Sequence, residues 1–254
     1  MTADEYLRNL LRREQVDTGL YSPARLALTT LEPLMREWAG QYFVSMDASG
    51  SFAKGTGNSS GTDVDAFVSL TSTTPNPLKE IYTRLAAFLE ERGYPARRQN
   101  VSIGTSINGT QVDVVPGVRQ DQWGNDHSLY RRKADSWTKT NVAKHISHVK
   151  GSNRIDEIRI LKLWRSQKRL DISSFCLELF TINALHGARV GALSDNVRTA
   201  FTFFNSPSFA NARAIDPSNT NNTVSDDLTV ADRSAISAAA GNALNAPYWE
   251  HIVQ

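Results

Sequence analysis

The chain has 254 residues, of which 40% are hydrophobic and 21% are charged, and its formal net charge is +2. This composition is ordinary for a globular protein with a substantial core, and the near balance of charge gives no reason to expect nonspecific binding to long nucleic acid. Cys176 is the single cysteine, which excludes an intramolecular disulfide and fits a reducing compartment. No apolar run approaches about 18 residues, and the N-terminus is amphipathic and carries acids, unlike a signal peptide. We therefore expect a cytoplasmic protein without a membrane segment.

The first half of the chain predicts helices around a small sheet. Helices are expected at residues 2–14, 22–38 and 78–92, and strands at 42–46, 63–70, 96–103 and 110–115. Thr2 is the expected N-cap of the first helix, and Pro33 is expected to kink or divide the second. Asn108-Gly109 is a hairpin signal between the last two strands.

The second half of the chain predicts mainly helices. They are expected at residues 153–168, 172–189 and 229–244, and residues 216–227 are expected to form a polar loop. The apolar residues of the segment 118–149 show no regular spacing that would predict a helix or a strand. The basic run Arg131–Lys133 and the interspersed aromatic residues of this segment suit either a nucleotide grip or a solvated loop with aromatic anchors.

The stretch from Asp47 to Leu70 organises the rest of the chain. Asp63 and Asp65 stand two residues apart at the start of a strand, so their side chains share a face, roughly 7 Å apart. Val64 and the other apolar residues of the strand point into a core. Two neighbouring carboxylates repel unless a cation shares them, and Mg²⁺ prefers oxygen ligands. The pair therefore predicts a metal site.

Gly50 and Ser51 form a turn that opens a short helix between the two strands of this stretch. Glycine lets the backbone approach a ligand closely, and the amides at a helix start attract phosphate. The hydroxyl of Ser51 adds a donor for the same anion. A phosphate grip and a metal site in one strand-turn-strand unit predict chemistry on a nucleoside triphosphate.

Gly50-Ser51, Lys54-Gly55-Thr56 and Gly61-Thr62-Asp63-Val64-Asp65 together resemble the signature of the DNA polymerase β-type nucleotidyltransferases. Within this superfamily the chain is most similar to the oligoadenylate synthases, the cyclic GMP-AMP synthase-like enzymes (bacterial CD-NTases) and the archaeal CCA-adding enzymes. These proteins carry a third carboxylate on a later strand, and Gln111-Val112-Asp113-Val114-Val115-Pro116 matches it. The resemblance implies an α+β fold. A polymerase β-like palm, a mixed sheet with flanking helices, would occupy residues 1–150, and a helical domain completing the nucleotide cleft would occupy 151–254.

The resemblance also implies roles for the acidic residues and the turn. Asp63 and Asp65 would bridge two Mg²⁺ or Mn²⁺ ions, and Asp113 would bind the ion that activates the attacking hydroxyl. Gly50 and Ser51 would hold the triphosphate. All three acids and the Gly-Ser turn are present, which favours an active enzyme over a degenerate nucleotide-binding module.

The helical half carries a shorter part of the same resemblance. Ile160-Leu161-Lys162-Leu163-Trp164 is similar to a lysine-aromatic pattern on a helix of the cyclase and oligoadenylate enzymes, and Ser173-Ser174-Phe175 is similar to their next helix start. This likeness would place Lys162 and Ser174 at the β- and γ-phosphates and Phe175 near the base.

Without the resemblance, the residues alone leave the roles of two lysines undecided. Lys54 either reaches a phosphate or lies on the surface. Lys162 falls on an apolar face of its helix, where an ammonium group needs an anionic partner. That partner is either a nucleotide phosphate or a neighbouring acid such as Asp156 or Glu178.

These features predict a template-independent, metal-dependent nucleotidyltransferase that uses nucleoside triphosphates, with ATP expected among them. The favoured product is a cyclic or short linear oligonucleotide second messenger of the antiviral defence type. The alternatives are nucleotide addition to RNA or tRNA 3′ ends, as in CCA-adding enzymes, and modification of a target by a toxin- or antitoxin-type enzyme. RNA tailing needs a surface that tracks many phosphates, whereas this chain offers one short basic run. A small acceptor needs only a second pocket, which we expect residues 119–137 to line.

The sequence leaves several properties of the product and the assembly open. They are the base preference, the linkage, the activating signal, the protein partners and the oligomeric state.

Overall fold

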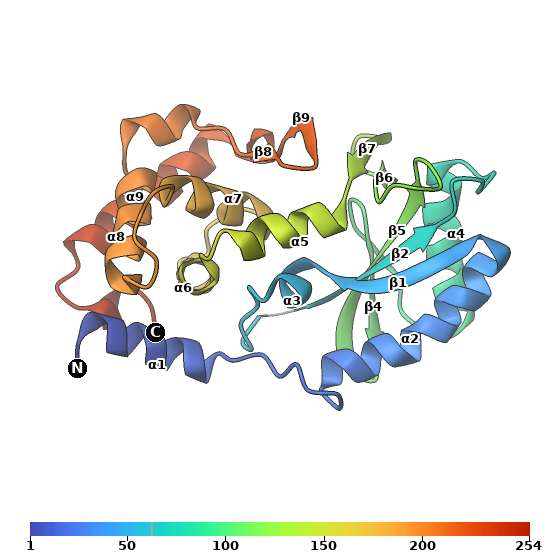
Figure 1. Ribbon diagram of the computed structural model, residues 1–254, viewed down its shortest axis with the longest axis horizontal. Coiled ribbons are helices and arrows are strands. Elements are labelled where there is room, and N and C mark those ends of the chain that lie inside the picture. The colour runs from blue at the N-terminus through green and yellow to red at the C-terminus, as the bar shows by residue number, and fades with distance from the viewer. Residues whose placement is uncertain (62) are drawn as a thin grey trace. The chain divides into compact units, whose positions relative to one another are not determined.

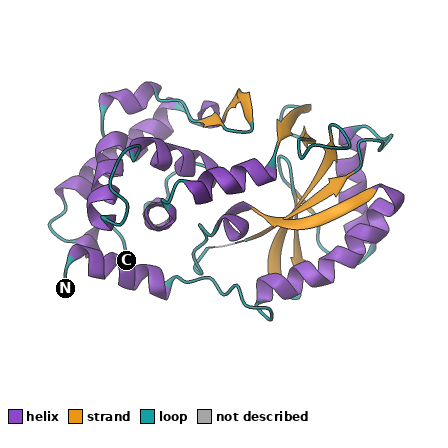
Figure 2. Ribbon diagram, viewed as in Figure 1, coloured by secondary structure: helices purple, strands orange, loops and turns teal. Residues whose placement is uncertain are grey.

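The computed structural model describes residues 1–61 and 63–254, so Thr62 of the acidic motif lies outside the described residues. The chain forms two compact units. The helical unit comprises Met1–Gln15, Gly55–Ser60 and Ser147–Gln254, and the sheet unit comprises Val16–Lys54 and Gly61–Ile146. Figure 2 shows the long strands together in the sheet unit and most helices in the other.

A mixed sheet forms the centre of the sheet unit (Figure 1). Its strands are β1 (Phe43–Ser49), β2 (Val64–Leu70), β3 (Arg97–Arg98), β4 (Ile103–Ile107), β5 (Thr110–Arg119), β6 (His127–Arg131) and β7 (Ser136–Thr140). The order is β1-β2-β5-β4-β3, and β6 joins β5 to β7. β2 and β5 are parallel, and the other neighbours are antiparallel. The expected mixed sheet with flanking helices is confirmed.

Two helices, α2 (Pro23–Ala39) and α4 (Leu78–Glu91), bury one face of this sheet. The strand residues in that core include Val64 and Ala66 of β2. Because successive side chains of a strand alternate between the faces, Asp65 lies on the opposite face. The helices therefore stabilise the sheet from behind and leave the face of Asp65 for chemistry.

Pro33 lies inside α2 but does not divide it, because α2 continues through all 17 residues. Leu31 and Met35, on either side of the proline, are fully buried. Packing of this apolar face against the sheet holds the helix together although proline removes one backbone hydrogen bond.

The hairpin between β4 and β5 forms at Asn108-Gly109 as expected, with positive φ angles of 51° and 81°. The preceding strand differs from the prediction. The expected strand 96–103 is interrupted by a turn, in which the amide of Gln99 donates to the carbonyl of Ser102 at 2.9 Å. This turn separates β3 from β4 and fixes the position of the Gln99 side chain.

The β6–β7 hairpin is absent from the sequence prediction. Its turn contains neither glycine nor proline, and Asp135 adopts the positive φ of 43° instead. The hydroxyl of Tyr130 donates to Asp135 at 2.6 Å, so a side-chain contact rather than turn composition stabilises this connection.

An aromatic core holds the helical unit together. The α-helices of this unit are α1 (Ala3–Arg13), α6 (Ile155–Gln167), α7 (Ser174–Ala184), α8 (Leu193–Phe204) and α9 (Val230–Asn245). The helix α5 (Val142–Gly151) belongs to the sheet unit up to Ile146 and to the helical unit from Ser147. Trp164, Phe180, Phe201, Phe204 and Phe209 are almost fully buried in one cluster. The capping box of Thr2 confirms the expected start of the first helix.

The segment expected as a polar loop contains a small hairpin, formed by β8 (Ile215–Asp216) and β9 (Asn219–Thr223). Asp216 is buried and accepts from the amide of Ser218 at 2.8 Å. Polar side chains thus bond the turn locally, which a hydrophobic pattern does not register. No helix among the described residues is long and apolar enough to cross a membrane.

Residues Gly55–Ser60, which connect the Gly-Ser turn to the acidic strand, belong to the helical unit. The guanidinium of Arg159 donates to the carbonyl of Gly57 at 3.1 Å, and the amide of Asn58 donates to the carbonyl of Arg159 at 3.0 Å. The backbone amide of Ser60 donates to the carboxylate of Glu14 at 3.0 Å. Helices α1 and α6 therefore hold this connection in a defined conformation.

Candidate active site

The Gly-Ser turn lies directly against the carboxylate of Asp65. Ser49, the last residue of β1, is the register partner of Asp65 in β2, and α3 (Gly50–Lys54) begins at the next residue. Gly50 has a φ of +57°, and a Cβ added to it would lie 1.7 Å from Oδ2 of Asp65. Only glycine fits this position without a shift of the carboxylate.

Asp65 and Asp113 are direct neighbours on parallel strands. They are register partners in the β2–β5 ladder, and both are half-buried. Val112 and Val114 on either side of Asp113 point into the core under the sheet, so Asp113 projects from the same face as Asp65. The sheet thus brings together two acids that are 48 positions apart in the sequence.

The carboxylate of Asp113 accepts a hydrogen bond from a neutral side chain, and charged side chains nearby affect its pKa. Gln99 donates from Nε2 to Oδ1 of Asp113 at 2.7 Å, and Ser102 donates to Oε1 of Gln99 at 3.0 Å. Burial raises the pKa of Asp113 above its usual value, and the negative charge of Asp63 raises it further. The charge of Arg97 and the bond from Gln99 act in the opposite direction.

Asp63 lies immediately before β2 and is exposed. Its negative charge disfavours the charged form of Asp113 and so raises the pKa of that carboxyl. Carboxylate oxygens without nitrogen or sulfur donors suit a hard ion such as Mg²⁺. Among the residues that the structure describes, however, no three His, Cys, Asp or Glu side chains are grouped as a metal site as they stand. The donor chemistry of the three acids fits Mg²⁺ or Mn²⁺.

Ser51 is the second residue of α3 and is half-buried. Lys54 is the last residue of the same helix and is only 7% exposed. The alternative that this lysine lies on the surface is therefore wrong. Both residues stand within five positions of Gly50, on the helix that follows β1. Their contact with a phosphate stays a prediction.

Lys162 has an acidic partner inside the helical unit. Its Nζ lies 2.6 Å from Oε1 of Glu178 and 2.8 Å from Oγ1 of Thr56, and the hydroxyl of Thr56 donates to Glu178 at 2.8 Å. Lys162 and Glu178 are both buried. Of the two partners that the sequence allowed, the salt bridge with Glu178 is thus observed, and a phosphate contact stays a prediction.

Ser174 and Phe175 begin α7 in the helical unit. The Ser174 hydroxyl is exposed and accepts from the Arg165 guanidinium at 2.9 Å, while Phe175 packs partly buried against the aromatic core. The N-cap of this helix is Ser173, whose side chain accepts from the amide of Cys176 at 3.3 Å.

The structure therefore divides the predicted residues into two groups. The sheet unit contains Gly50, Ser51, Lys54, Asp63, Asp65 and Asp113, and the helical unit contains Lys162, Ser174 and Phe175. Sequence reasoning missed Gln99, which bonds Asp113, and Thr56, which bonds Lys162. Gln99 stands between other polar residues of the segment 96–103, so no signal in the sequence singled it out.

Comparisons with known proteins agree on the family of this chain. Residues 1–153 match the family model described as "Second Messenger Oligonucleotide or Dinucleotide Synthetase domain". No curated protein matched the sequence.

Solved bacterial structures share the fold over nearly the whole chain. Escherichia coli MS115-1 CdnC with ATP is 20% identical, with a TM-score of 0.80, over 99% of this chain and 97% of that one. Bradyrhizobium diazoefficiens CD-NTase CdnG with GTP is 14% identical, with a TM-score of 0.77, over 94% and 89%. Elizabethkingia meningoseptica CdnE cyclic dinucleotide synthase with GTP and Apcpp is 16% identical, with a TM-score of 0.74, over 97% and 100%.

These structures confirm the predicted α+β nucleotidyltransferase fold, and the family match confirms the predicted group within the superfamily. The matched region contains the Gly-Ser turn and all three acids, and extends over more than half of the chain. The protein is therefore a nucleotidyltransferase that belongs to the Second Messenger Oligonucleotide or Dinucleotide Synthetase family.

Proposed function

We propose that this enzyme joins nucleoside triphosphates to one another, without a template, into a cyclic or short linear oligonucleotide. The observation that carries the proposal is the β2–β5 register, which sets Asp65 beside Asp113 while the backbone of Gly50 touches the carboxylate of Asp65. A phosphate held at the Gly-Ser turn would then meet the acids directly.

The proposed reaction is an in-line displacement at the α-phosphorus. A ribose hydroxyl of the acceptor forms a new P–O bond, and the bond between the α-phosphorus and its bridging oxygen breaks. Pyrophosphate leaves with the bonding electrons, and the hydroxyl proton passes to Asp113 or to water. One pyrophosphate is therefore released for each phosphodiester bond formed.

Asp63, Asp65 and Asp113 would hold two divalent cations, Mg²⁺ or Mn²⁺. Bound ions would stabilise the negative charge on the entering and leaving oxygens. The fit is supported by the interaction that raises the pKa of Asp113, because a cation between Asp63 and Asp113 would remove the repulsion between them. Gly50 and Ser51 would orient the triphosphate, and Gln99 would hold the carboxylate of Asp113 toward the acceptor.

Lys54, Lys162, Ser174 and Phe175 are proposed as further nucleotide-binding residues. Ser174 is exposed and Lys54 buried, so we expect Ser174 to bind phosphate directly and Lys54 to act mainly through its positive charge. Lys162, which bonds Glu178 and Thr56, would contact the β- and γ-phosphates through its ammonium group. Phe175 would contact the base.

Nucleoside triphosphates, with ATP among them, are proposed as both donor and acceptor. The CdnC structure contains ATP and the CdnG structure contains GTP, which supports this substrate class. The net charge of +2 supports a small acceptor over a long RNA, because RNA tailing needs many phosphate contacts. We further propose that the product acts as a cytoplasmic signal in antiviral defence, as in the bacterial enzymes that the sequence resembles.

Product analysis tests this proposal. The purified chain is incubated with labelled ATP, GTP, CTP and UTP in Mg²⁺ or Mn²⁺, with and without tRNA, and the products are separated and identified by mass spectrometry. We expect a small oligonucleotide that forms without tRNA. Salt-sensitive labelling of tRNA 3′ ends, with no small product from nucleotides alone, would overturn the choice of acceptor.

A further inference from the structure

A cavity of about 280 Å³ lies in the sheet unit at the end of β1 and β2 that is remote from the acids. Tyr42 immediately precedes β1, and Leu70 is the last residue of β2. The β1–β2 register pairs Phe43 with Leu70 at this end and Ser49 with Asp65 at the other. Leu70 stands five positions after Asp65, so the cavity lies roughly 17 Å along the strand from the proposed active site.

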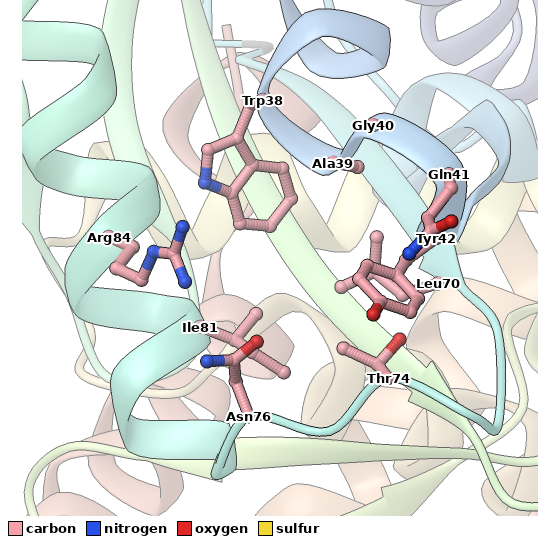
Figure 3. A pocket seen from close by; sticks show the side chains of 10 residues that line it. All are labelled: Trp38, Ala39, Gly40, Gln41, Tyr42, Leu70, Thr74, Asn76, Ile81 and Arg84. Carbon is pink, nitrogen blue, oxygen red and sulfur yellow. The ribbon is translucent and has the colours of Figure 1, made fainter.

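Aromatic and apolar side chains form the walls of this cavity. Figure 3 shows the indole of Trp38 and the ring of Tyr42 on its two sides, with Ile81 below them. Leu70 and Ile81 are buried, while Trp38 and Tyr42 are half-buried. Walls of this kind accept a flat ring, because aromatic side chains contribute a large contact area and favourable stacking.

Polar groups line the edge of the cavity. The amide of Asn76 donates from Nδ2 to Glu80 at 2.8 Å, which leaves its carbonyl oxygen and one N–H for a ligand. Within the described part of the chain, no hydrogen bond joins Nε1 of Trp38 or the hydroxyl of Tyr42 to the protein. The carboxamide of Asn76, the indole N–H of Trp38 and the phenol of Tyr42 thus supply donors and acceptors for the polar edge of a heterocycle.

The charge at the cavity is close to balanced. Arg84 contributes one guanidinium, and Glu80 lies 3.5 Å from it in an exposed ion pair. A triphosphate needs several cationic or amide donors, and this cavity offers one compensated cation. Its electrostatics therefore favour a neutral ligand over a nucleoside triphosphate.

We propose that this cavity is a second small-molecule site that binds a neutral purine nucleoside. A purine ring matches the aromatic walls, the amide of Asn76 matches its hydrogen-bonding edge, and the volume is near the lower limit for ligand pockets, about 300 Å³. The proposal is independent of the acceptor and product proposed above, because none of its residues belongs to the acid site.

The full chain is titrated with adenosine and with guanosine in EDTA, and heat is recorded by calorimetry. The indole N–H signals are followed in parallel by nuclear magnetic resonance, and Trp38→Phe assigns the signal of Trp38. We expect saturable binding of at least one nucleoside and a shift of the Trp38 signal. Asn76→Ala should weaken binding about tenfold, the effect of one lost ligand hydrogen bond.

Asp65→Asn serves as the control at the other site and should leave nucleoside binding unchanged. Trp38 packs partly against the core, so the exposed variant Arg84→Ala provides a second check at the cavity with little risk to folding. It should change affinity less than Asn76→Ala, because the ligand is neutral. The proposal fails if neither nucleoside binds, if Asn76→Ala has no effect, or if Asp65→Asn abolishes binding.

Discussion

Gly50 has no room for a side chain, since a Cβ at this position would lie 1.7 Å from Oδ2 of Asp65. We expect Gly50→Ala to lower the rate of product formation about 100-fold by displacing the carboxylate. Gly93→Ala is the matched control, because Gly93 also has a positive φ, +81°, but no atom lies within 4 Å of its added Cβ. Similar activity losses in both variants would show that backbone strain, and not the carboxylate, is responsible.

Gln99 positions Asp113 through the bond of 2.7 Å from its amide to Oδ1. We expect Gln99→Ala to lower kcat about tenfold while leaving KM for the donor nucleotide nearly unchanged, because the donor is proposed to bind at the Gly-Ser turn and not at Gln99. Gln99→Glu should lower kcat further, since it places a second carboxylate beside Asp113. The control is Gln120→Ala, which removes a comparable amide that donates to Ser128 at 3.3 Å. A rise in KM with unchanged kcat would contradict the positioning role.

Asp113 makes folding less favourable at neutral pH. Its folded pKa lies above the unfolded value because burial and the charge of Asp63 disfavour the carboxylate. The resulting loss of stability is present above the folded pKa and disappears as pH falls through it. We therefore expect Asp113→Asn to abolish turnover but raise Tm at pH 7 by about 1–3 °C. Thermal unfolding of both proteins at several pH values should show that the difference in Tm disappears in acid. A Tm of Asp113→Asn below that of the wild type at pH 7 would contradict the prediction.

The ion pair between Lys162 of α6 and Glu178 of α7 is buried in the helical unit, and both of its side chains bond Thr56 of the Gly55–Ser60 connection. Lys162→Ala leaves the buried carboxylate of Glu178 without its cation, so we expect a loss of about 3–5 kcal/mol in unfolding free energy. Lys162→Met/Glu178→Gln removes both charges and should recover most of that loss.

The double variant also tests the nucleotide role of Lys162. If this lysine contacts the β- and γ-phosphates, the stable double variant will bind triphosphate more weakly than the wild type and bind monophosphate almost normally. Equal affinities of the wild type and the double variant for both nucleotides would leave Lys162 with the structural role alone.

The elements differ in how well the sequence predicts them. The alternating apolar residues around Asp65 and Asp113 indicate buried strands, and the acids follow from the motif they share with nucleotidyltransferases. The β6–β7 hairpin was missed because Asp135 takes a left-handed conformation without a glycine beside it. Gln99 and Thr56 were missed because their partners, Asp113 and Lys162, lie far away in the sequence, and such pairings depend on the finished fold.

The two units of the molecule have separate cores, and the residues proposed to bind nucleotide are found in both units. The sheet unit provides the acids and the Gly-Ser turn on the face that α2 and α4 leave uncovered. The helical unit provides Lys162 and Ser174. Cys176 is buried within the helical core.

The proposed active site is tested most directly by measuring pyrophosphate release and phosphodiester formation in one reaction, for the wild type and Asp65→Asn. Labelled nucleoside triphosphates and Mg²⁺ are supplied without RNA, and the exposed variant Asp17→Asn is the control. We predict equal amounts of pyrophosphate and new phosphodiester bonds in the wild type and control. Asp65→Asn should be slower by about 1,000-fold, as loss of roughly 4 kcal/mol of transition-state stabilisation requires. Near-full activity of a folded Asp65→Asn protein would contradict the proposed active site.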